Sequence, residues 1–189
     1  MNAARGASRV RDTVGADAGA EQDALYARCI ADHGAAIERL ACGYEADADA
    51  RRDLVQDIHL ALWRSFRLFD GRCSLRTWTY RVAHNVGATH VGRDRRRARG
   101  HVGIDELADA PDADNPEQTA AERHVMARLT ALIHQLKPTD RQLILLYLED
   151  LEAAAMAEIT GLSVNAVNVK IYRIKALLAQ RFRGGRYDL

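Results

Sequence analysis

The sequence predicts an all-α protein made of two small helical domains joined by a flexible acidic linker. Along most of the chain, apolar residues recur at three- and four-residue steps, which is the period of a helix with one buried face. Long stretches rich in Ala, Leu, Arg and Glu favour helices, and the 189 residues include only 3 prolines. Residues 101–121 interrupt the periodicity with an acidic, proline-containing stretch, so the expected helices fall into two groups.

The composition argues against several classes of protein. Apolar residues make up 48% of the chain and charged residues 28%, as in ordinary globular proteins. No run reaches the roughly 18 to 20 apolar residues that a membrane-spanning helix needs. The N-terminus lacks the apolar core of a secretory signal, so we expect a cytoplasmic protein without membrane insertion. Cys29, Cys42 and Cys73 follow neither disulfide nor zinc spacing, and we expect no metal and no cofactor.

The first domain is expected over residues 21–100, after a flexible leader at residues 1–20. The leader is rich in Ala, Gly, Arg and Asp, and chain ends of this kind are commonly poorly ordered. The first helix should cover residues 21–44, because its apolar positions follow the helical period. We expect an interruption of this helix near His33 and Gly34.

Two further helices complete the first domain. The second begins at Ala50 and stops before the turn dipeptide Asp70-Gly71. Ser74 is placed to cap the third helix, because its hydroxyl can accept a hydrogen bond from a free N–H group of the first turn. That helix should continue into residues 93–99, which hold five arginines in seven positions.

The second domain is expected over residues 122–183, with a tail at residues 184–189. Pro138 ends its first helix or starts the next one, since proline is tolerated only in the first turn of a helix. A strongly apolar helix then runs to Leu148, and the last helix begins at Val164.

A helix–turn–helix pattern, in which two helices cross at a tight turn, covers residues 153–171. Gly161 lies where the first helix must end in a left-handed conformation, and Ser163 is placed to cap the second helix. Val167 and Ile171 are four residues apart and can pack back onto the first helix. The exposed face then carries Asn and Lys, which can hydrogen-bond to base edges or phosphates. A plain helical hairpin is the alternative.

Charge is distributed unevenly, although the formal net charge is only +1. The arginine cluster at 93–99 is followed by seven acids and no Lys or Arg over residues 101–122. Residues 164–187 then carry six basic residues and no acid. Basic patches are typical of surfaces that bind nucleic acid, because each neutralised phosphate releases counterions. A solvated surface without a partner is the alternative.

Two blocks of the first domain also suggest binding surfaces. Asp53, Gln56, Asp57 and Leu60 fall on one strip of the second helix, where polar and apolar groups alternate as in a protein-binding face. In residues 75–85, aromatic residues interleave with arginines, so that the rings can stack on unpaired bases while the arginines hold phosphates. Alternatively, the tryptophan of this block is a core residue.

In this order, the blocks resemble a bacterial RNA polymerase sigma factor of the small, two-domain extracytoplasmic-function (ECF) type. The resemblance covers about residues 23–183. It is carried by residues 53–57, residues 78–85 with the arginine cluster, Pro138, Arg141, Tyr147-Leu148-Glu149 and the Gly161 helix–turn–helix. His59 departs from the pattern, because the family often has Phe at this position.

The resemblance implies a factor that binds core RNA polymerase and directs promoter-specific transcription initiation, with an N-terminal region 2 domain and a C-terminal region 4 domain. The residues that bind core polymerase would be Asp53, Leu54, Gln56, Asp57 and Leu60. The residues that read and melt the minus-ten promoter element would be Arg76, Trp78, Tyr80, Arg81, His84, Asn85, Arg93, Arg95, Arg96 and Arg97. The residues that read the minus-thirty-five element would be Ser163, Asn165, Ala166, Asn168, Val169, Lys170, Arg173 and Lys175.

The same resemblance implies the partners of the protein. They would be core RNA polymerase, promoter DNA and an anti-sigma factor, with no small-molecule substrate and no catalytic residue. The two domains would form separate heads, each suited to a different stretch of promoter and useful only while mounted on polymerase.

Two alternatives to this function stand beside it. A stand-alone helix–turn–helix regulator would bind duplex operators without polymerase, usually as a dimer, and would leave residues 53–85 without a role. An enzyme would need a metal site at Asp53, Asp57 and His59, or a nucleophile pair at Cys42 and His33. No loop or turn in the sequence brings three such ligands together.

Overall fold

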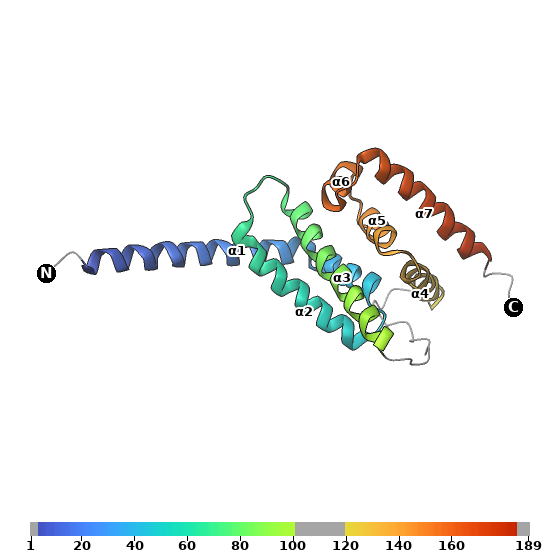
Figure 1. The fold of residues 1–189 in the computed structure, drawn as a ribbon, viewed down its shortest axis with the longest axis horizontal. Coiled ribbons are helices and arrows are strands. Elements are labelled where there is room, and N and C mark those ends of the chain that lie inside the picture. The colour runs from blue at the N-terminus through green and yellow to red at the C-terminus, as the bar shows by residue number, and fades with distance from the viewer. Residues whose placement is uncertain (1–3, 101–119, 185–189) are drawn as a thin grey trace.

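The computed structural model describes the backbone of residues 4–100 and 120–184 and the side chains of residues 19–93 and 121–183. Within these ranges the chain forms seven α-helices, one short 3-10 turn and no strand, which confirms the all-α prediction (Figure 1). Most of the predicted acidic linker, residues 101–119, lies outside the described residues, as do residues 185–189 of the predicted tail. None of the helices in the described ranges is long and apolar enough to cross a membrane.

Three helices form the first bundle. They are α1 (Ala4–Tyr44), α2 (Ala48–Ser65) and α3 (Leu75–Gly100), and each packs against the other two. A 3-10 turn, η1 (Phe66–Leu68), follows α2 and contacts α1. The third helix continues into the arginine cluster, as predicted.

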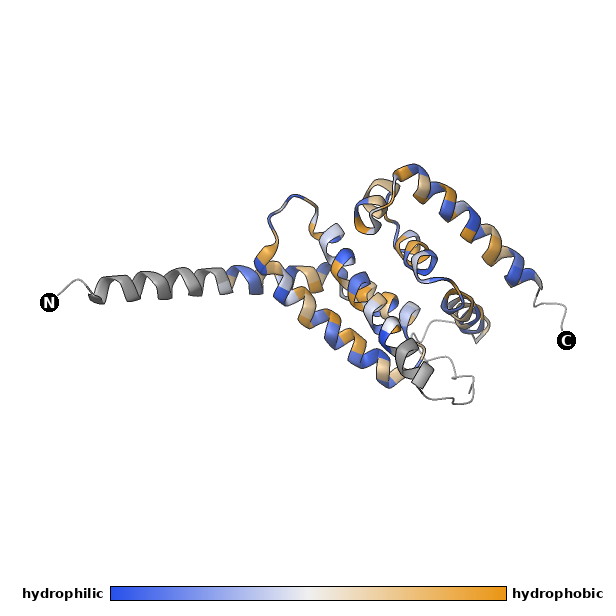
Figure 2. Cartoon of the chain, in the orientation of Figure 1, coloured by the Kyte–Doolittle hydropathy of each residue, from blue (hydrophilic) through white to orange (hydrophobic). Residues whose placement is uncertain are grey.

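The buried sides of these helices follow the apolar period of the sequence. Hydrophobic and hydrophilic positions alternate around α2 in Figure 2. Ile37 and Leu40 of α1 meet a buried stripe on α2 that includes Leu54, Ile58 and Leu62. Each such side chain contributes about 1.5 to 3 kcal/mol when it is fully buried, so packing holds the bundle together more than helix propensity does.

Four helices form the second bundle. They are α4 (Ala120–His134), α5 (Pro138–Leu148), α6 (Ala153–Thr160) and α7 (Val164–Gly184). The long last helix, α7, packs against each of the other three. Pro138 lies in the first turn of α5, where its missing N–H group would have had no partner within the helix.

The first helix differs from the prediction in two ways. It begins at Ala4, so the backbone of most of the predicted flexible leader is helical and projects from the bundle as the blue ribbon of Figure 1. It also runs through His33 and Gly34 without a break. The His33 ring lies 6.3 Å from the Tyr80 ring of α3, between centroids. Packing against α3 outweighs the cost of a helical glycine, which is about 1 kcal/mol.

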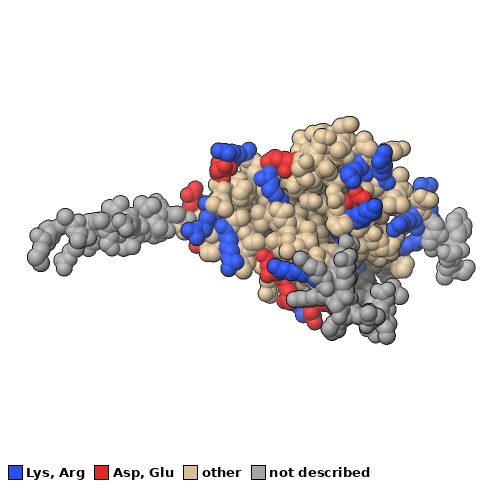
Figure 3. Space-filling model, viewed as in Figure 1, with Lys and Arg blue, Asp and Glu red and all other residues tan. Residues whose placement is uncertain are grey.

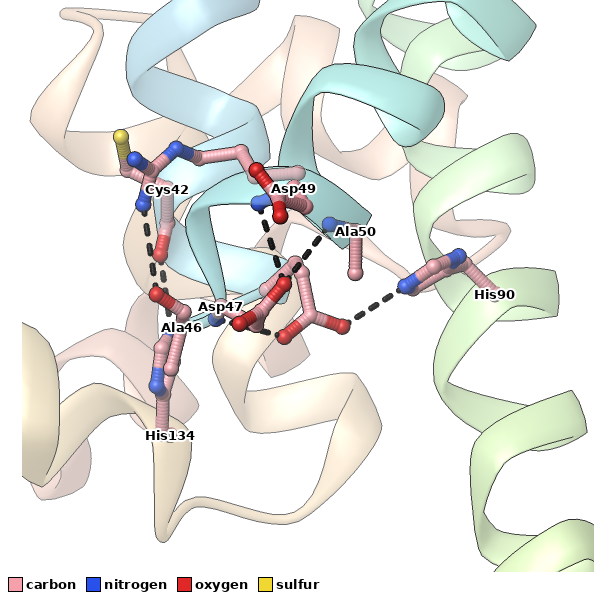
Figure 4. A network of polar contacts seen from close by, with 9 residues as sticks. Cys42, Ala46, Asp47, Asp49, Ala50, His90 and His134 are labelled. Atoms are coloured by element: carbon pink, nitrogen blue, oxygen red, sulfur yellow. Dashed lines mark hydrogen bonds and ion pairs between the residues drawn. The ribbon is translucent and has the colours of Figure 1, made fainter. Parts of the chain in front are cut away.

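The turn between α1 and α2 is held by its own side chains and by α3 (Figure 4). Asp47 caps α2, because its Oδ1 accepts hydrogen bonds from the N–H groups of Asp49 at 3.0 Å and Ala50 at 2.8 Å. The Oε2 atom of Glu45 lies 2.8 Å from Nε2 of His90. These contacts fix the angle at which α2 leaves α1.

The two bundles pack against each other. α1 and α3 of the first contact α4, α5 and α6 of the second. Nε2 of His134 lies 2.8 Å from the carbonyl oxygen of Cys42 at the end of α1 (Figure 4). Gly43 approaches α5 so closely that a Cβ atom at this position would lie 2.4 Å from Cδ2 of Leu145. The expectation of separate heads is therefore wrong for this structure, although the Gly161 turn stays exposed.

Candidate nucleic-acid and polymerase interfaces

A strip of exposed side chains follows one side of α2. Asp53, Gln56 and Asp57 are exposed, and Leu60 exposes 46% of its surface. Leu54 does not belong to this strip, because it is 0% exposed and faces the core. A residue next to Asp53 in sequence points about 100° away around the helix, which turns Leu54 into the bundle. The prediction that Leu54 contacts polymerase is therefore wrong.

His59 lies beside the strip and makes an internal contact. Its Nδ1 atom lies 2.8 Å from the hydroxyl of Tyr26 in α1, and the two rings meet edge to face. The histidine that departs from the family pattern thus joins α1 to α2 and leaves the exposed strip unchanged.

An open groove between α2 and α3 brings two of the predicted sites together. Asp57 and Leu60 line it from α2, and Asn85 and Arg93 line it from α3. An acidic group and an apolar group stand on one wall, while an amide and a guanidinium stand on the other. The predicted polymerase-binding strip is therefore adjacent to the predicted DNA-reading helix.

Trp78 combines a packing role with partial exposure. Its indole N–H donates to Oγ of Ser65 at 2.9 Å, and its ring lies 5.4 Å from the Phe69 ring, edge to face. The guanidinium of Arg81 lies 6.0 Å from the centroid of the indole. These contacts hold the half-buried ring in one orientation.

Tyr80 and His84 are buried, which contradicts their prediction as minus-ten contacts. They are 3% and 0% exposed, and they lie one helical turn apart on the inward side of α3. Nδ1 of His84 lies 2.8 Å from the Tyr44 hydroxyl, and burial lowers the pKa of His84 to about 3, so the ring is neutral. Burial, followed by the nearby Glu149 carboxylate, raises the pKa of Tyr80 to about 12.

Two arginines near the start of α3 are held by groups of the second bundle. Arg76 donates a hydrogen bond from Nη2 to the backbone carbonyl of Glu149. Nη2 of Arg81 lies 2.6 Å from Oε1 of Glu158 in α6. Both guanidinium groups therefore contact the second bundle in this structure.

Two of the predicted minus-ten contacts further along α3 are exposed. Asn85 and Arg93 are both exposed. The side chains of Arg95, Arg96 and Arg97 lie outside the described residues, although their backbone continues α3.

The turn between α6 and α7 has the predicted geometry. Gly161 ends α6 with φ 72°, and its N–H group bonds to the carbonyl of Ala157 at 2.9 Å. Oγ of Ser163 accepts a hydrogen bond from the N–H group of Ala166 at 3.2 Å, which caps α7. Val167, one of the predicted packing positions, is fully buried. The helix–turn–helix prediction is confirmed in its local structure.

The outer face of α7 presents most of the side chains predicted to read the minus-thirty-five element. Asn165, Asn168, Val169 and Arg173 are exposed. Figure 3 shows several Lys and Arg side chains on the side of the molecule that carries α7, and others over the first bundle. This face can therefore offer amide donors and acceptors together with positive charge.

Two lysines of α7 have partners on α5. Nζ of Lys170 lies 3.0 Å from Oδ1 of Asp140. Nζ of Lys175 donates to the hydroxyl of Tyr147 at 2.8 Å and lies 4.6 Å from the centroid of that ring. These contacts brace α7 against α5 and hold both ammonium groups close to the exposed face.

Two of the three cysteines have a raised pKa in this structure. The thiol of Cys29 lies 3.1 Å from Oγ1 of Thr79, and burial raises the pKa of Cys29. Burial also raises the pKa of Cys73. Among the residues whose side chains are described, no group of three His, Cys, Asp or Glu residues is arranged to hold a metal ion.

Sequence reasoning missed the residues that join the two bundles. Arg39 donates two hydrogen bonds, each 2.7 Å, to the carboxylate of Glu149, which lies 110 residues away in the sequence. Contacts at such separations, including that of Glu158, leave no local pattern to recognise. Trp63 was also missed, although its exposed indole lies about one helical turn beyond Leu60 and continues the strip on α2.

Each of the two bundles matches a known protein family model. The family model for Sigma-70 region 2 matches residues 29–97, and the model for Sigma-70, region 4 matches residues 126–178. RNA polymerase sigma factor CnrH from Cupriavidus metallidurans is 30% identical over 175 residues, which cover 87% of this chain and 90% of that relative.

Two solved structures share the fold. The structure of CnrH in complex with the cytosolic domain of CnrY matches with a TM-score of 0.63 and 24% identity, over 89% of this chain and 94% of that chain. The sigma factor RpoE in complex with the anti-sigma factor NepR, from Bartonella quintana, matches with a TM-score of 0.68 and 16% identity, over 85% and 96%.

The fold and the matched regions define a class of protein, namely transcription initiation factors with a region 2 bundle and a region 4 bundle. The chain belongs to the RNA polymerase sigma factors, and within them to the ECF type. It binds core RNA polymerase and promoter DNA and directs promoter-specific transcription initiation.

Proposed function

We propose that this sigma factor binds core polymerase and the two promoter elements through three separate surfaces. The strip on α2, formed by Asp53, Gln56, Asp57 and Leu60, docks on core polymerase. The accessible side of α3 reads and melts the minus-ten element, and α7 reads the minus-thirty-five element. Residues 21–100 form the region 2 domain and residues 122–183 form the region 4 domain, with the acidic linker at 101–121 between them.

The groove between α2 and α3 is the observation that carries this proposal. It places Asp57 and Leu60 beside Asn85 and Arg93. A polymerase surface bound to Asp57 and Leu60 would place Asn85 and Arg93 at the edge of the DNA channel. Non-template bases that leave the duplex would then be captured next to Trp78, on a positively charged helix.

The proposed minus-ten contacts all lie along α3. They are Arg76, Trp78, Arg81, Asn85, Arg93, Arg95, Arg96 and Arg97. The proposed minus-thirty-five contacts are Ser163, Asn165, Ala166, Asn168, Val169, Lys170, Arg173 and Lys175. Asn165 and Asn168 can read adenine edges, whereas Arg173 and Lys175 lie further along α7 and suit phosphates.

Reconstitution with core RNA polymerase tests the docking surface. The purified chain should co-elute with core polymerase on gel filtration and give promoter-specific transcript starts. Leu60→Ala should weaken this complex, because Leu60 is the exposed apolar residue of the strip. Leu68→Ala is the matched control, since Leu68 is also an exposed leucine but lies in η1. Tight binding to a duplex operator without polymerase would instead favour a stand-alone regulator.

A regulatory partner is part of the proposal. Both similar solved structures are complexes, one of CnrH with the cytosolic domain of CnrY and one of RpoE with the anti-sigma factor NepR. We propose that an anti-sigma factor likewise binds this chain, where region 4 exposes Leu148, Val169 and Tyr172. A purified anti-sigma factor should lower the amount of chain that co-elutes with core polymerase.

We also propose that the protein acts in the cytoplasm, where polymerase and promoter meet, and that it has no catalytic centre of its own. Cell fractionation should place it with the polymerase pool. In the reconstituted complex, core polymerase should supply all of the nucleotidyl-transfer activity, and this chain should supply none.

A further inference from the structure

The outer face of α7 carries two large apolar side chains that packing within region 4 does not explain. Val169 and Tyr172 expose 41% and 77% of their surfaces. The buried side of the same helix is filled by other residues, namely Val167, Ile171 and Ile174, which are 0%, 7% and 4% exposed. Region 4 therefore completes its core without Val169 and Tyr172. Neighbouring apolar side chains that stay exposed among polar ones mark a candidate binding surface.

The helical period puts this apolar pair at the centre of the exposed face. At about 100° per residue, four exposed residues fall within about 60° of one another, namely Asn165, Val169, Tyr172 and Ala176. They point away from the side of α7 that carries the buried Val167. A groove that receives the outer side of α7 would therefore meet Val169 and Tyr172 directly.

Basic side chains flank the pair on both sides. Arg173 and Lys175 are exposed and lie two positions apart, so they point to nearly opposite sides of the helix, with Tyr172 between them. The major groove of B-DNA is wide enough for one α-helix, and a phosphate backbone runs along each wall. Arginine and lysine on the two flanks suit these backbones, which leaves the centre of the face to meet base edges.

An apolar side chain can recognise one feature of a base edge in the major groove. Thymine presents a methyl group there, whereas cytosine presents an amino group and the purines present polar atoms. Contact between that methyl group and the side chains of Val169 and Tyr172 would remove apolar surface of both partners from water, which is favourable. The apolar pair therefore suits thymine better than any other base.

Two asparagines complement the apolar pair. Asn165 precedes Val169 by four residues, and Asn168 precedes Tyr172 by four residues. Each asparagine thus lies about one helical turn before an apolar side chain, on the same face. An asparagine amide can form two hydrogen bonds with the major-groove edge of adenine. Adenine and a thymine methyl group occur together in an A·T base pair, so the face carries two sets of side chains suited to A·T pairs.

We propose that α7 reads thymine methyl groups in the minus-thirty-five element through Val169 and Tyr172. The element then contains thymine at the positions that these two side chains contact, paired with adenines within reach of Asn165 and Asn168. This inference rests on the proposed function of α7 and deepens it, because it names the base and the chemical group that this chain selects.

Val169 and Tyr172 also belong to the surface on which we propose that an anti-sigma factor binds. If they served that protein alone, the methyl groups of the promoter would have no effect on binding. Changing the DNA while the protein stays the same separates the two roles. Deoxyuridine allows this, because it lacks the methyl group of thymine and keeps the same hydrogen-bonding groups.

The test uses the full chain bound to core polymerase. A pool of duplex DNA with a randomised central segment is enriched on this complex, and sequencing gives a promoter with its minus-thirty-five element. Each thymine of that element is then replaced by deoxyuridine, one at a time, and filter binding measures the affinity of the complex for each duplex. At least one replacement should weaken binding by about fourfold, as expected for one buried methyl group. Replacements outside the promoter elements should have no effect.

Variants of the chain assign this effect to the apolar pair. Val169→Ser with Tyr172→Ser removes both apolar side chains without changing the charge of α7. This variant should bind the thymine and deoxyuridine duplexes equally. Tyr172→Phe keeps the ring and should keep the preference for thymine.

The matched control is Val125→Ser with Met126→Ser. These two apolar residues of α4 are 47% and 51% exposed and also belong to region 4. The control should discriminate between thymine and deoxyuridine as strongly as the parent chain does. Because each variant is judged by the ratio of its affinities for two duplexes, a general loss of DNA binding does not imitate the expected result.

Three results would overturn the inference. The first is equal affinity of the parent chain for the thymine and deoxyuridine duplexes, and the second is an enriched minus-thirty-five element without thymine. The third is a preference for thymine that survives in Val169→Ser with Tyr172→Ser, since another side chain would then contact the methyl group. Failure of the proposed function gives a different result. A pool without a common minus-thirty-five sequence would reject the proposed role of α7, and this inference with it.

Discussion

A neutral histidine in the core of region 2 ties the stability of the protein to pH. His84 is fully buried, its Nδ1 atom contacts the Tyr44 hydroxyl at 2.8 Å, and its Nε2 atom has no hydrogen-bond partner. Burial lowers its pKa to about 3. Since an unfolded histidine titrates near pH 6.5, the unfolded chain binds a proton between these values that the folded chain does not.

We therefore expect stability to fall as the pH drops below about 6.5, by up to about 1.4 kcal/mol per pH unit from this residue, down to a pH of about 3. His84→Gln should remove this part of the slope. Urea unfolding of both proteins across this range measures it. His124→Gln, at an exposed histidine of α4, should keep the slope of the parent protein. An unchanged slope in His84→Gln would mean that the ring is protonated in the folded state.

Two glycines of the chain should respond oppositely to the same substitution. Gly161 has φ 72°, a conformation that costs an L-residue about 1 to 2 kcal/mol. Gly34 lies within α1, where Ala is favoured over Gly by about 0.5 to 1 kcal/mol and its Cβ atom would meet only an ordinary contact. Thermal unfolding followed by circular dichroism should show Gly161→Ala destabilised and Gly34→Ala stabilised. The two shifts having the same sign would contradict this account.

At the scale of a helix, the start of α3 depends on one hydroxyl. Oγ of Ser74 accepts a hydrogen bond from the N–H group of Thr77 at 3.0 Å. Ser74→Ala should cost about 1 kcal/mol of unfolding free energy, and Ser74→Asp should restore it, because Asp is an equally good cap. Denaturant titration measures both variants. A loss in Ser74→Asp as large as that in Ser74→Ala would show that the hydroxyl is not acting as a cap.

Helices were predictable from the sequence because their signals are local. The buried stripe of α2, the cap at Ser74 and the left-handed turn at Gly161 each follow from residues a few positions apart. The predicted break at Gly34 was wrong because contacts with α3, which lies far along the chain, outweigh a local preference. Leu54 was assigned to the polymerase surface through the family resemblance, and Tyr80 was assigned to the DNA surface, but both are buried in this structure.

At the scale of the whole molecule, the relation between the two bundles was not predictable. The pair formed by Arg39 and Glu149 joins positions 110 residues apart, and the close approach of Gly43 to Leu145 depends on the shape of both bundles. Resemblance to a family identifies each region but carries no information on how the regions of this chain pack together. These contacts also involve Arg76 and Arg81, which belong to the proposed minus-ten surface, so how far that surface is covered is set by packing between the bundles.

Salt should open the molecule if ion pairs hold the bundles together. Raising NaCl from about 0.1 M to about 1 M shortens the Debye length from about 10 Å to about 3 Å and weakens exposed pairs most. The Arg39 and Arg81 side chains are 61% and 31% exposed, so both pairs should weaken. The radius of gyration of the parent chain should therefore rise with salt. Glu149→Gln with Glu158→Gln should be expanded at low salt and nearly insensitive to it. A parent chain that stays compact at about 1 M NaCl would mean that apolar contacts such as Leu145 on Gly43 keep it closed, since salt does not weaken burial.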